Sequence, residues 1–311
     1  MSKTIEQLFL AEINPSKDCN FLLAISGGVD SMVLANLFLT NNLNFSIAHC
    51  NFQLRGKESN DDEIFISKWC SEKNVKLYNK KFSTEDYCKK NKLTIQMGAR
   101  ELRYEWFEEL TNKEKYDFVV TAHHLDDQLE TFIINSIRGT GIDGLVGIPD
   151  KINKIIRPLL MISKEQIIEF SKVNKITYRE DSSNDEEDYL RNKIRHSVIP
   201  YLKSDDKNVL LKFKKTIENL NSTKLFVEKI ISETKNKIFI NKENTIVINL
   251  DLLRDLNPIE FYIHELFKDF EFNYKEVIKL FDSDSGKYIS SRNYKMIKNK
   301  NTLIISQTSN D

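Results

Sequence analysis

Short apolar runs alternate with amphipathic stretches along the first half of the chain. A short apolar run is typical of a buried strand, whereas apolar residues three or four positions apart indicate a helix. The predicted strands are 21–25, 45–50, 75–82 and 117–122, and the predicted helices are 32–39, 61–73, 95–110 and 126–137. This alternation predicts an α/β fold with a doubly wound, mostly parallel sheet. Ligands of such sheets bind beyond the carboxyl ends of the strands.

The alternation stops after residue 160. A helix predicted from 163 to about 174 and a polar stretch at 180–188 lead into another helix that ends near Pro200. From Tyr201 the sequence is rich in lysine, with a long helix predicted at 205–235 and short strands near 245–249 and 293–306. We therefore expect two domains, 1–202 and 203–311, of which the second is mainly helical.

The most specific motif follows the first predicted strand and precedes the first predicted helix. It reads Ser26-Gly27-Gly28-Val29-Asp30-Ser31. The glycines let the backbone approach a ligand, and the first N–H groups of the helix lack partners, so the turn predicts an anion site. No lysine follows at the spacing of a Walker loop, and Asp30 stands where that lysine is expected. A carboxylate beside a polyphosphate needs a cation between them, so we expect Asp30 to hold Mg²⁺; the alternative is that Asp30 only caps the helix.

Ser-Gly-Gly-X-Asp-Ser is the signature of the PP-loop, or N-type, ATP pyrophosphatases, and this chain resembles it at every fixed position. The resemblance implies the fold of the adenine nucleotide alpha hydrolases. It also implies that ATP binds at residues 26–31 and is cleaved to AMP and pyrophosphate, so that an acceptor oxygen becomes adenylated.

A second polar cluster lies where the fourth predicted strand turns into a helix. It reads His123-His124-Leu125-Asp126-Asp127-Gln128-Leu129-Glu130-Thr131. On a helix, Glu130 lies four residues after Asp126 and three after Asp127, so at least two carboxylates share one face. Such a face suits a cation such as Mg²⁺ or an amine. The alternatives are an acidic helix start that complements the dipole, and a zinc site, for which no third ligand has a suitable spacing.

This cluster resembles the second hallmark motif of the lysidine synthases, a family within the PP-loop superfamily. The resemblance implies that Asp127 and Glu130 bind the ammonium group of lysine, or the metal. The group that takes the proton from the lysine amine stays open between Asp127 and His124.

Two further segments extend the resemblance. Residues 48–56 carry His49 and Arg55, which the resemblance places beside ATP; the alternative is a histidine at a strand end and a solvated arginine. Arg100 and Arg103 lie three residues apart on the predicted helix 95–110. We expect Arg100 to offset the negative charge that develops as pyrophosphate leaves.

Basic side chains later in the chain are candidates for contacts with RNA. Arg191 and Arg195 are four residues apart, and the stretch 287–300 combines Lys287 and Arg292 with tyrosines. These groups suit RNA phosphates and exposed bases, although solvated surface residues are about as common. We expect these four residues to contact tRNA. The resemblance also extends through 181–184.

Composition narrows the function classes. The 46 basic and 46 acidic side chains cancel, so any contact with nucleic acid has to come from local patches. The 4 cysteines form no Cys-X-X-Cys pair, which argues against a zinc ribbon, a redox dithiol and an iron–sulfur site. No stretch has the length of a membrane span or the pattern of a signal peptide. We expect a cytoplasmic protein with no membrane partner.

The resemblance implies a ligase that adenylates the carbonyl oxygen at carbon 2 of the wobble cytidine in tRNA(Ile) with a CAU anticodon, and then joins L-lysine to that carbon with release of AMP. ATP would be the co-substrate, with Mg²⁺, and the product would decode AUA as isoleucine. Two alternatives stay open: a tRNA-thiolating PP-loop enzyme, which the missing cysteine pair disfavours, and a non-catalytic protein that binds nucleotide and RNA. A homodimer is also open. Many family members carry a further small C-terminal domain, so a chain that ends at Asp311 is expected to be a short form or truncated.

Overall fold

The computed structural model describes residues 4–13, 18–179 and 189–308, apart from the side chain of Tyr189. The chain forms two compact units, Met1–Leu220 and Asn221–Asp311. The boundary between these units falls inside the long helix α11 (Val209–Ile238), and the domain division after residue 202 stays a prediction from the sequence. A continuous helix carries no loop or composition change at such a point.

The first unit contains the predicted alternation of strands and helices. Its strands are β1 (Phe21–Ala24), β2 (Phe45–Asn51), β3 (Leu77–Lys81), β4 (Phe118–Val120), β5 (Lys151–Ile152) and β6 (Ile155–Ile156). Its helices are α1 (Ile5–Ile13), α2 (Val29–Thr40), α3 (Lys57–Lys73), α4 (Thr84–Asn91), α5 (Ile95–Glu114), α6 (Leu125–Ile137), α7 (Ile142–Leu145), α8 (Lys164–Val173), α9 (Tyr189–Lys193), the π-helical turn η3 (Ile194–Val198), α10 (Ile199–Asp205) and the start of α11.

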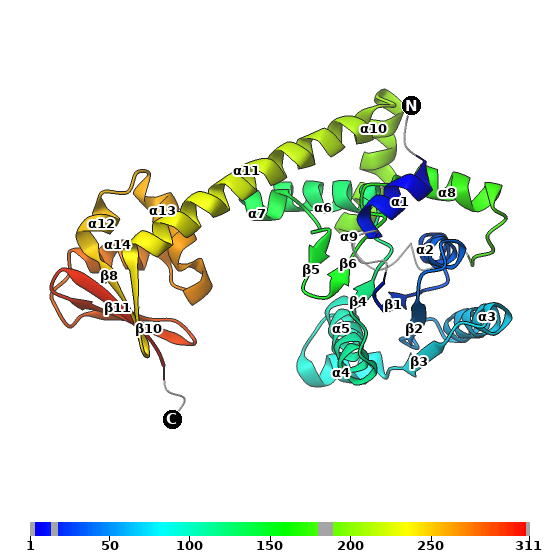
Figure 1. Cartoon of the computed structure of the whole chain (residues 1–311), viewed down its shortest axis with the longest axis horizontal. Coiled ribbons are helices and arrows are strands. Elements are labelled where there is room, and N and C mark those ends of the chain that lie inside the picture. Colours follow the sequence, from blue (N-terminus) through cyan, green and yellow to red (C-terminus); the bar gives the residue numbers. More distant parts are fainter. Residues whose placement is uncertain (1–3, 14–17, 180–188, 309–311) are drawn as a thin grey trace. The chain divides into compact units, whose positions relative to one another are not determined.

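The six strands of this unit form one sheet in the order β3-β2-β1-β4-β6-β5. All neighbours are parallel except the terminal pair β5 and β6. Figure 1 shows α2 and α3 on one side of this sheet and α4 and α5 on the other. The predicted doubly wound, mostly parallel sheet is confirmed. Its strand order reverses direction at β1, so the ends of β1 and β4 open a crevice where ligands bind in this class of fold.

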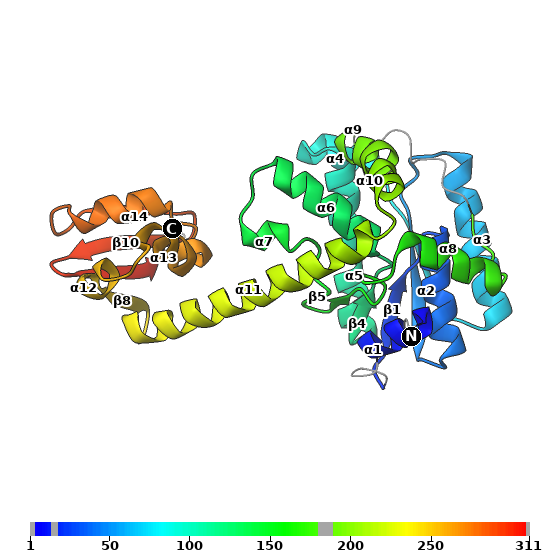
Figure 2. The same cartoon turned by 90° about the horizontal axis from the view of Figure 1, so that it is seen from above.

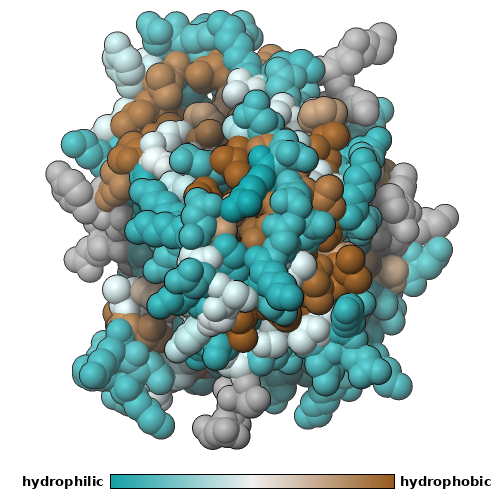
Figure 3. Space-filling view, turned by 90° about the vertical axis from the view of Figure 1, so that its left-hand side faces the viewer, coloured by the Kyte–Doolittle hydropathy of each residue, from teal (hydrophilic) through white to brown (hydrophobic). Residues whose placement is uncertain are grey.

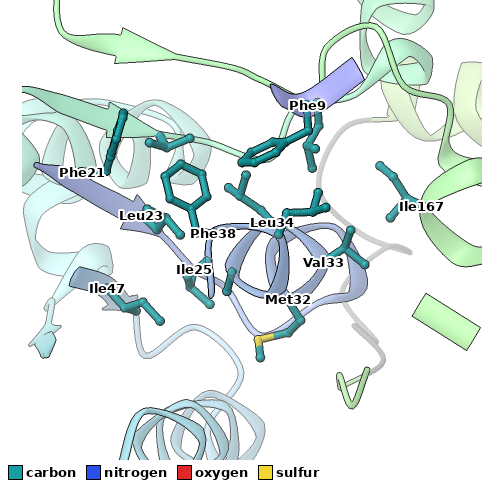
Figure 4. Close-up of a cluster of buried hydrophobic side chains, with 14 of the residues drawn as sticks. Phe9, Phe21, Leu23, Ile25, Met32, Val33, Leu34, Phe38, Ile47 and Ile167 are labelled. Atoms are coloured by element: carbon teal, nitrogen blue, oxygen red, sulfur yellow. The ribbon is translucent and has the colours of Figure 1, made fainter. Parts of the chain in front are cut away.

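The two faces of β1 anchor two different cores. Phe21 and Leu23 belong to the cluster that α1, α2, α3 and α8 cover, and Leu22 belongs to the cluster under α5. This is the alternation that a strand buried on both faces requires. In the first cluster the Phe38 ring lies 5.3 Å from Phe9 and 5.1 Å from Phe21, between ring centres (Figure 4). The end of β1 is therefore held rigidly from both sides.

A third cluster joins α6 to the helices near residue 200. Leu125, Leu129 and Ile134 of α6 are buried with Ile194 and Ile199. In both views α9 and α10 lie close to α6 (Figure 2). The start of α6 is thereby placed beside residues that are about 65 positions away in the sequence.

The second unit combines helices with a sheet. After the end of α11 its strands are β7 (Phe239–Lys242), β8 (Thr245–Asn249), β9 (Tyr288–Ser290), β10 (Tyr294–Asn299) and β11 (Thr302–Gln307), and its helices are α12 (Leu250–Arg254), α13 (Ile259–Phe267), the 3-10 turn η4 (Lys268–Phe270) and α14 (Tyr274–Phe281). The strands form one antiparallel sheet in the order β7-β8-β11-β10-β9. The sequence predicted parts of β8, β10 and β11, but not a complete sheet.

No helix in the described part of the chain is long and apolar enough to cross a membrane. Hydrophilic side chains cover much of the face drawn in Figure 3, and hydrophobic side chains lie among them.

Candidate active site

The loop from Ser26 to Ser31, here called the glycine loop, joins β1 to α2. Gly27 has a φ of +97°, a conformation that side chains disfavour. The Ser31 hydroxyl accepts hydrogen bonds from the N–H groups of Ser26 at 3.3 Å and Gly27 at 3.2 Å, and donates to the Gly28 carbonyl at 2.9 Å. Ser31 therefore holds the shape of the loop.

The N-terminus of α2 has the properties of an anion site. Gly28 is the N-cap residue and no side chain caps this end. The first hydrogen bond within the helix runs from the Met32 N–H to the Gly28 carbonyl, so the N–H groups of Val29, Asp30 and Ser31 have no partner inside the helix. Together with the helix dipole, these donors fit a phosphate group.

Asp30 does not cap this helix, so the alternative role considered from the sequence is wrong. Its Oδ1 lies 2.5 Å from Nζ of Lys164, the first residue of α8. Its Oδ2 lies 3.8 Å from Nε2 of His124. The carboxylate thus lies between two nitrogen groups from distant segments, and neither contact has a signal in the local sequence.

His124 and Asp127 form a capping box at the start of α6. The His124 N–H donates to Asp127 Oδ2 at 2.9 Å, and the Asp127 N–H donates to His124 Nδ1 at 3.4 Å. The predicted acidic helix start is therefore present, but it accounts for only one oxygen of Asp127. Burial would raise the pKa of Asp127, but His124, His123, the N–H bond and Arg195 together lower it.

Arg195 binds both carboxylates of the predicted acidic face. Its Nε is 2.6 Å from Glu130 Oε1, and its Nη2 is 3.0 Å from Glu130 Oε2 and 3.2 Å from Asp127 Oδ1. Glu130 is only 2% exposed, and this burial raises its pKa. Arg191 Nε lies 3.6 Å from the same carboxylate. The face of α6 that the sequence predicted to bind a cation therefore binds the guanidinium group of Arg195 in this structure.

Asp126, the third carboxylate of the cluster, points to other partners. Its Oδ2 accepts the Lys164 N–H at 2.8 Å, and its Oδ1 pairs with Nζ of Lys203. Spacing alone could not separate Asp126 from Asp127, since both lie one helical turn before Glu130.

A crevice of about 400 Å³ lies beyond the carboxyl ends of β1, β2 and β4. It is lined by Ala24, Ile25, Ser26, Asp30, Ser31, Ala48, Cys50, Phe52, Arg103, Tyr104, Phe107, Thr121, Ala122, His123, Asp127 and Arg195. Burial lowers the pKa of His123 to about 4, so its ring is neutral at pH 7. Burial also raises the pKa of Cys50 to about 12, which keeps this thiol protonated. The glycine loop and the acidic face thus border one crevice.

Arg103 lines this crevice and Arg100 does not. The Arg103 guanidinium carbon lies 5.2 Å from the centre of the Phe52 ring. Arg100 instead lies 4.8 Å from the Tyr104 ring centre and lines a neighbouring cavity of about 540 Å³ together with the buried Arg157. The sequence predicted the helix that carries both arginines. Because the two side chains lie about one helical turn apart, only the packing of this helix decides which of them lines the crevice.

His49 and Arg55 support the loops around the crevice. His49 is 4% exposed, its Nδ1 bonds the Ile25 carbonyl at 2.9 Å, and burial lowers its pKa. Arg55 Nη2 lies 2.9 Å from Asp62, which also pairs at 2.5 Å with Nε of Arg179. The Arg179 N–H donates to the Gly27 carbonyl, so this network reaches the glycine loop.

The basic residues predicted in the second unit lie at its surface. Lys287 precedes β9 and Arg292 follows it, and both are exposed. Nearby, Lys295 Nζ lies 4.0 Å from the ring centre of Tyr288, which is 58% exposed. The further motif at 181–184 lies outside the described residues.

The described residues contain no group of three or more histidine, cysteine or acidic side chains that could hold a metal ion. Mg²⁺ does not need such a group, because proteins commonly bind it through one or two carboxylates and the oxygens of a phosphate substrate. Asp30 and Asp127 are the carboxylates that line the crevice.

The chain matches the PP-loop domain family over residues 1–202 and the TilS substrate binding domain over 241–308. It is 36% identical to the tRNA(Ile)-lysidine synthase of Bacteroides thetaiotaomicron, over 96% of this chain and 69% of that protein. The chain belongs to the tRNA(Ile)-lysidine synthase family.

Other members of the family give a similar picture. The tRNA(Ile)-lysidine synthase of Porphyromonas gingivalis is 34% identical over 91% of this chain, and that of Bacillus subtilis is 33% identical over 74%. The chain spans 63% and 50% of the lengths of these two relatives.

Among solved structures, the U34-tRNA thiolase NcsA of Methanococcus maripaludis superposes with a TM-score of 0.57 at 18% identity, covering 70% of this chain and 78% of that one. At this identity the likeness supports the PP-loop fold, which agrees with the predicted fold class.

Proposed function

We propose that this chain uses ATP to join L-lysine to carbon 2 of the wobble cytidine of tRNA(Ile) with a CAU anticodon, so that the tRNA reads AUA as isoleucine. Membership of the family supports this activity, and one observation of the site carries it. The uncapped helix at the glycine loop and the carboxylate of Asp127 border the same crevice, and Arg195, which also lines it, joins Asp127 to the buried Glu130. One end of this crevice suits phosphate and the other suits a cation.

The reaction has two steps. In the first, the cytidine oxygen at carbon 2 attacks the α-phosphate of ATP, an oxygen–phosphorus bond forms, and pyrophosphate leaves. In the second, the lysine side-chain nitrogen attacks carbon 2, the bond from that carbon to the AMP oxygen breaks, and the amine gives up a proton. The glycine loop would hold the phosphates, and Asp30 would contribute one carboxylate oxygen to Mg²⁺, which offsets phosphate charge when bound.

Arg103 is better placed than Arg100 to offset the charge that develops on pyrophosphate, because Arg103 lines the crevice. We therefore assign this role to Arg103. Arg100 would meet an anion only in the neighbouring cavity.

The lysine ammonium would bind beside Asp127 and Glu130, where Arg195 lies in this structure. Asp127 lines the crevice and is the proton acceptor that we propose. His124 is less suitable, because its Nδ1 lone pair already accepts the Asp127 N–H. Placing amine and adenylated carbon together would supply much of the rate, because well-oriented reactants can gain roughly 7 to 11 kcal/mol.

Arg191, Arg195, Lys287 and Arg292 stay proposed tRNA contacts. The two residues of the second unit are exposed, whereas Arg195 and Arg191 would have to exchange carboxylate partners for phosphates. A homodimer stays a prediction from the sequence.

A thiolating activity is not favoured. Such chemistry needs a reactive sulfur, and Cys50, which lines the crevice, is held as a thiol by its raised pKa of about 12.

The deciding experiment incubates the pure protein with ATP, radiolabelled lysine and a transcript of tRNA(Ile) with the CAU anticodon. We expect label in the tRNA and stoichiometric release of AMP and pyrophosphate. A transcript of methionine tRNA, which carries the same anticodon, and a reaction without ATP are the controls. ATP binding without transfer of lysine would refute the enzyme assignment and favour a non-catalytic binding protein.

A further inference from the structure

The glycine loop contains no cationic side chain, although it is built to receive a polyphosphate. Loops of the Walker type place a lysine after their glycines to reach the terminal phosphates, and here Asp30 takes that position. The helix dipole contributes only about half of a unit charge. The loop by itself therefore leaves most of the negative charge of a triphosphate without compensation.

Lys164 brings a cation to this loop from a distant part of the chain. Its Nζ lies 2.5 Å from Asp30 Oδ1, across a sequence separation of 134 residues. The Lys164 side chain is 34% exposed and that of Asp30 is 28% exposed, so solvent and solutes reach both groups. The ammonium group is thus beside the open N-terminus of α2.

Several contacts fix the backbone that carries Lys164. Asp126 accepts the Lys164 N–H at 2.8 Å and pairs with Lys203, and its side chain is only 9% exposed. Next to it, the Leu125 N–H donates to the Ile162 carbonyl at 2.9 Å. The start of α6 and the start of α8 are therefore joined, and the capping box of Ser163 sets the direction in which α8 leaves.

The core holds α8 in place from its other side. Ile167, one turn after Lys164, is fully buried in the cluster that contains α2 (Figure 4). The helix that carries the lysine and the helix that carries the anion site are therefore packed against each other, which limits relative movement of Lys164 and the glycine loop.

We propose that Lys164 is the phosphate-binding cation of the glycine loop, and that Asp126 is a positioning residue that holds Lys164 there. When a nucleotide with its metal enters, the ammonium group donates to phosphate oxygens, and the Asp30 carboxylate becomes available to the metal. Phosphate and carboxylate are both anionic oxygen acceptors, so this exchange conserves the charge-assisted hydrogen bond of Lys164. The inference rests on the proposed function only in taking ATP as the ligand of the loop.

Calorimetric binding of ATP, pyrophosphate and adenosine to the full chain tests this role without tRNA or lysine. We expect Lys164→Ala to bind ATP and pyrophosphate about tenfold to a hundredfold more weakly, the range for a hydrogen bond to a charged group, and to bind adenosine as the unaltered chain does. Lys164→Arg should recover most of the affinity. Lys172→Ala, which removes an exposed lysine at the other end of α8, is the matched control and should change nothing.

Asp126→Asn tests the positioning role, because the amide can still accept the Lys164 N–H but loses its ion pair with Lys203. We expect a smaller, still phosphate-selective loss of affinity, with adenosine binding retained. Unchanged ATP affinity in Lys164→Ala, or an equal loss for adenosine and ATP, would overturn the proposal. A chain that binds ATP with this pattern but transfers no lysine would refute the proposed function alone.

Discussion

The bond between Arg195 and the acidic face of α6 gives the sharpest test of the site, through the variant Arg195→Met. The change keeps much of the side-chain volume but removes the contacts at 2.6, 3.0 and 3.2 Å. Glu130, which is 2% exposed, then keeps a buried charge without its main partner.

Breaking a buried ion pair by removing one partner costs about 3–5 kcal/mol. Two features of the structure reduce this figure. The Arg195 side chain is 37% exposed, so solvent already screens part of the interaction, and Arg191 Nε remains 3.6 Å from Glu130. We therefore expect the free energy of unfolding of the first unit to fall by about 2–3 kcal/mol at pH 7.

The loss should depend on pH in a defined direction. Burial already raises the pKa of Glu130, and removal of Arg195 raises it further. Between the ordinary pKa of a glutamate and this raised value, the folded state binds more protons than the unfolded state, so stability falls as pH rises. The deficit of Arg195→Met should therefore be larger at pH 8 than at pH 5.

Urea unfolding followed by tryptophan fluorescence measures this stability. The chain has 2 tryptophans, Trp69 and Trp106, and both are buried in the first unit. With a denaturant slope of about 1–3 kcal/mol per molar urea, the midpoint should move down by about 1–2 M. The double variant Arg195→Met, Glu130→Gln should recover most of the loss. A deficit below about 0.5 kcal/mol, or one equal at pH 5 and pH 8, would refute the reasoning.

Three further predictions concern the crevice. Asp30→Asn should abolish release of AMP and pyrophosphate but lower the free energy of unfolding by less than about 1 kcal/mol, since the carboxylate is partly exposed. Retained turnover would remove Asp30 from the mechanism. Arg103→Ala should slow AMP release at saturating ATP at least about tenfold, and Arg100→Ala should not; the reverse order would show that the assignment is wrong. The pKa of His123 is about 4 in the folded chain and about 6.5 in the unfolded chain. As the pH drops through this interval, the unfolded state binds the proton first, so the free energy of unfolding falls, by up to about 3 kcal/mol. His123→Asn should weaken this loss of stability at acid pH, measured by urea unfolding. An unchanged loss in the variant would contradict the shifted pKa.

Local pattern was sufficient for most of the longer elements of the first unit, although α1 and α4 were not predicted. The predicted strands 21–25, 45–50, 75–82 and 117–122 overlap the first four observed strands, and the long predicted helix at 205–235 overlaps α11. Hydrophobic period and glycine turns are properties of neighbouring residues, so a short window reports them. The shortest elements were missed, among them the two-residue strands β5 and β6, because so few positions show no period.

Local sequence pattern also predicted the two polar segments of the site, since each lies where a strand passes into a helix. Ser26 to Ser31 follow β1, and Asp127 and Glu130 lie just after β4. Parallel neighbouring strands end at one edge, so a sequence that predicts the sheet also predicts that these segments meet.

Tertiary packing alone decided which side chains complete the site. Lys164 pairs with Asp30 across 134 residues, and Arg195 pairs with Glu130 across 65 residues. Neither pairing can be predicted from the residues next to it in the sequence. Arg100 and Arg103 are both on α5, yet only Arg103 lines the crevice. The amino-acid sequence by itself determined the sheet, the anion loop and the acidic face, because these arise from neighbours along the chain. The structure decided which distant cations neutralise them, because long-range pairing depends on how α6, α8 and η3 pack.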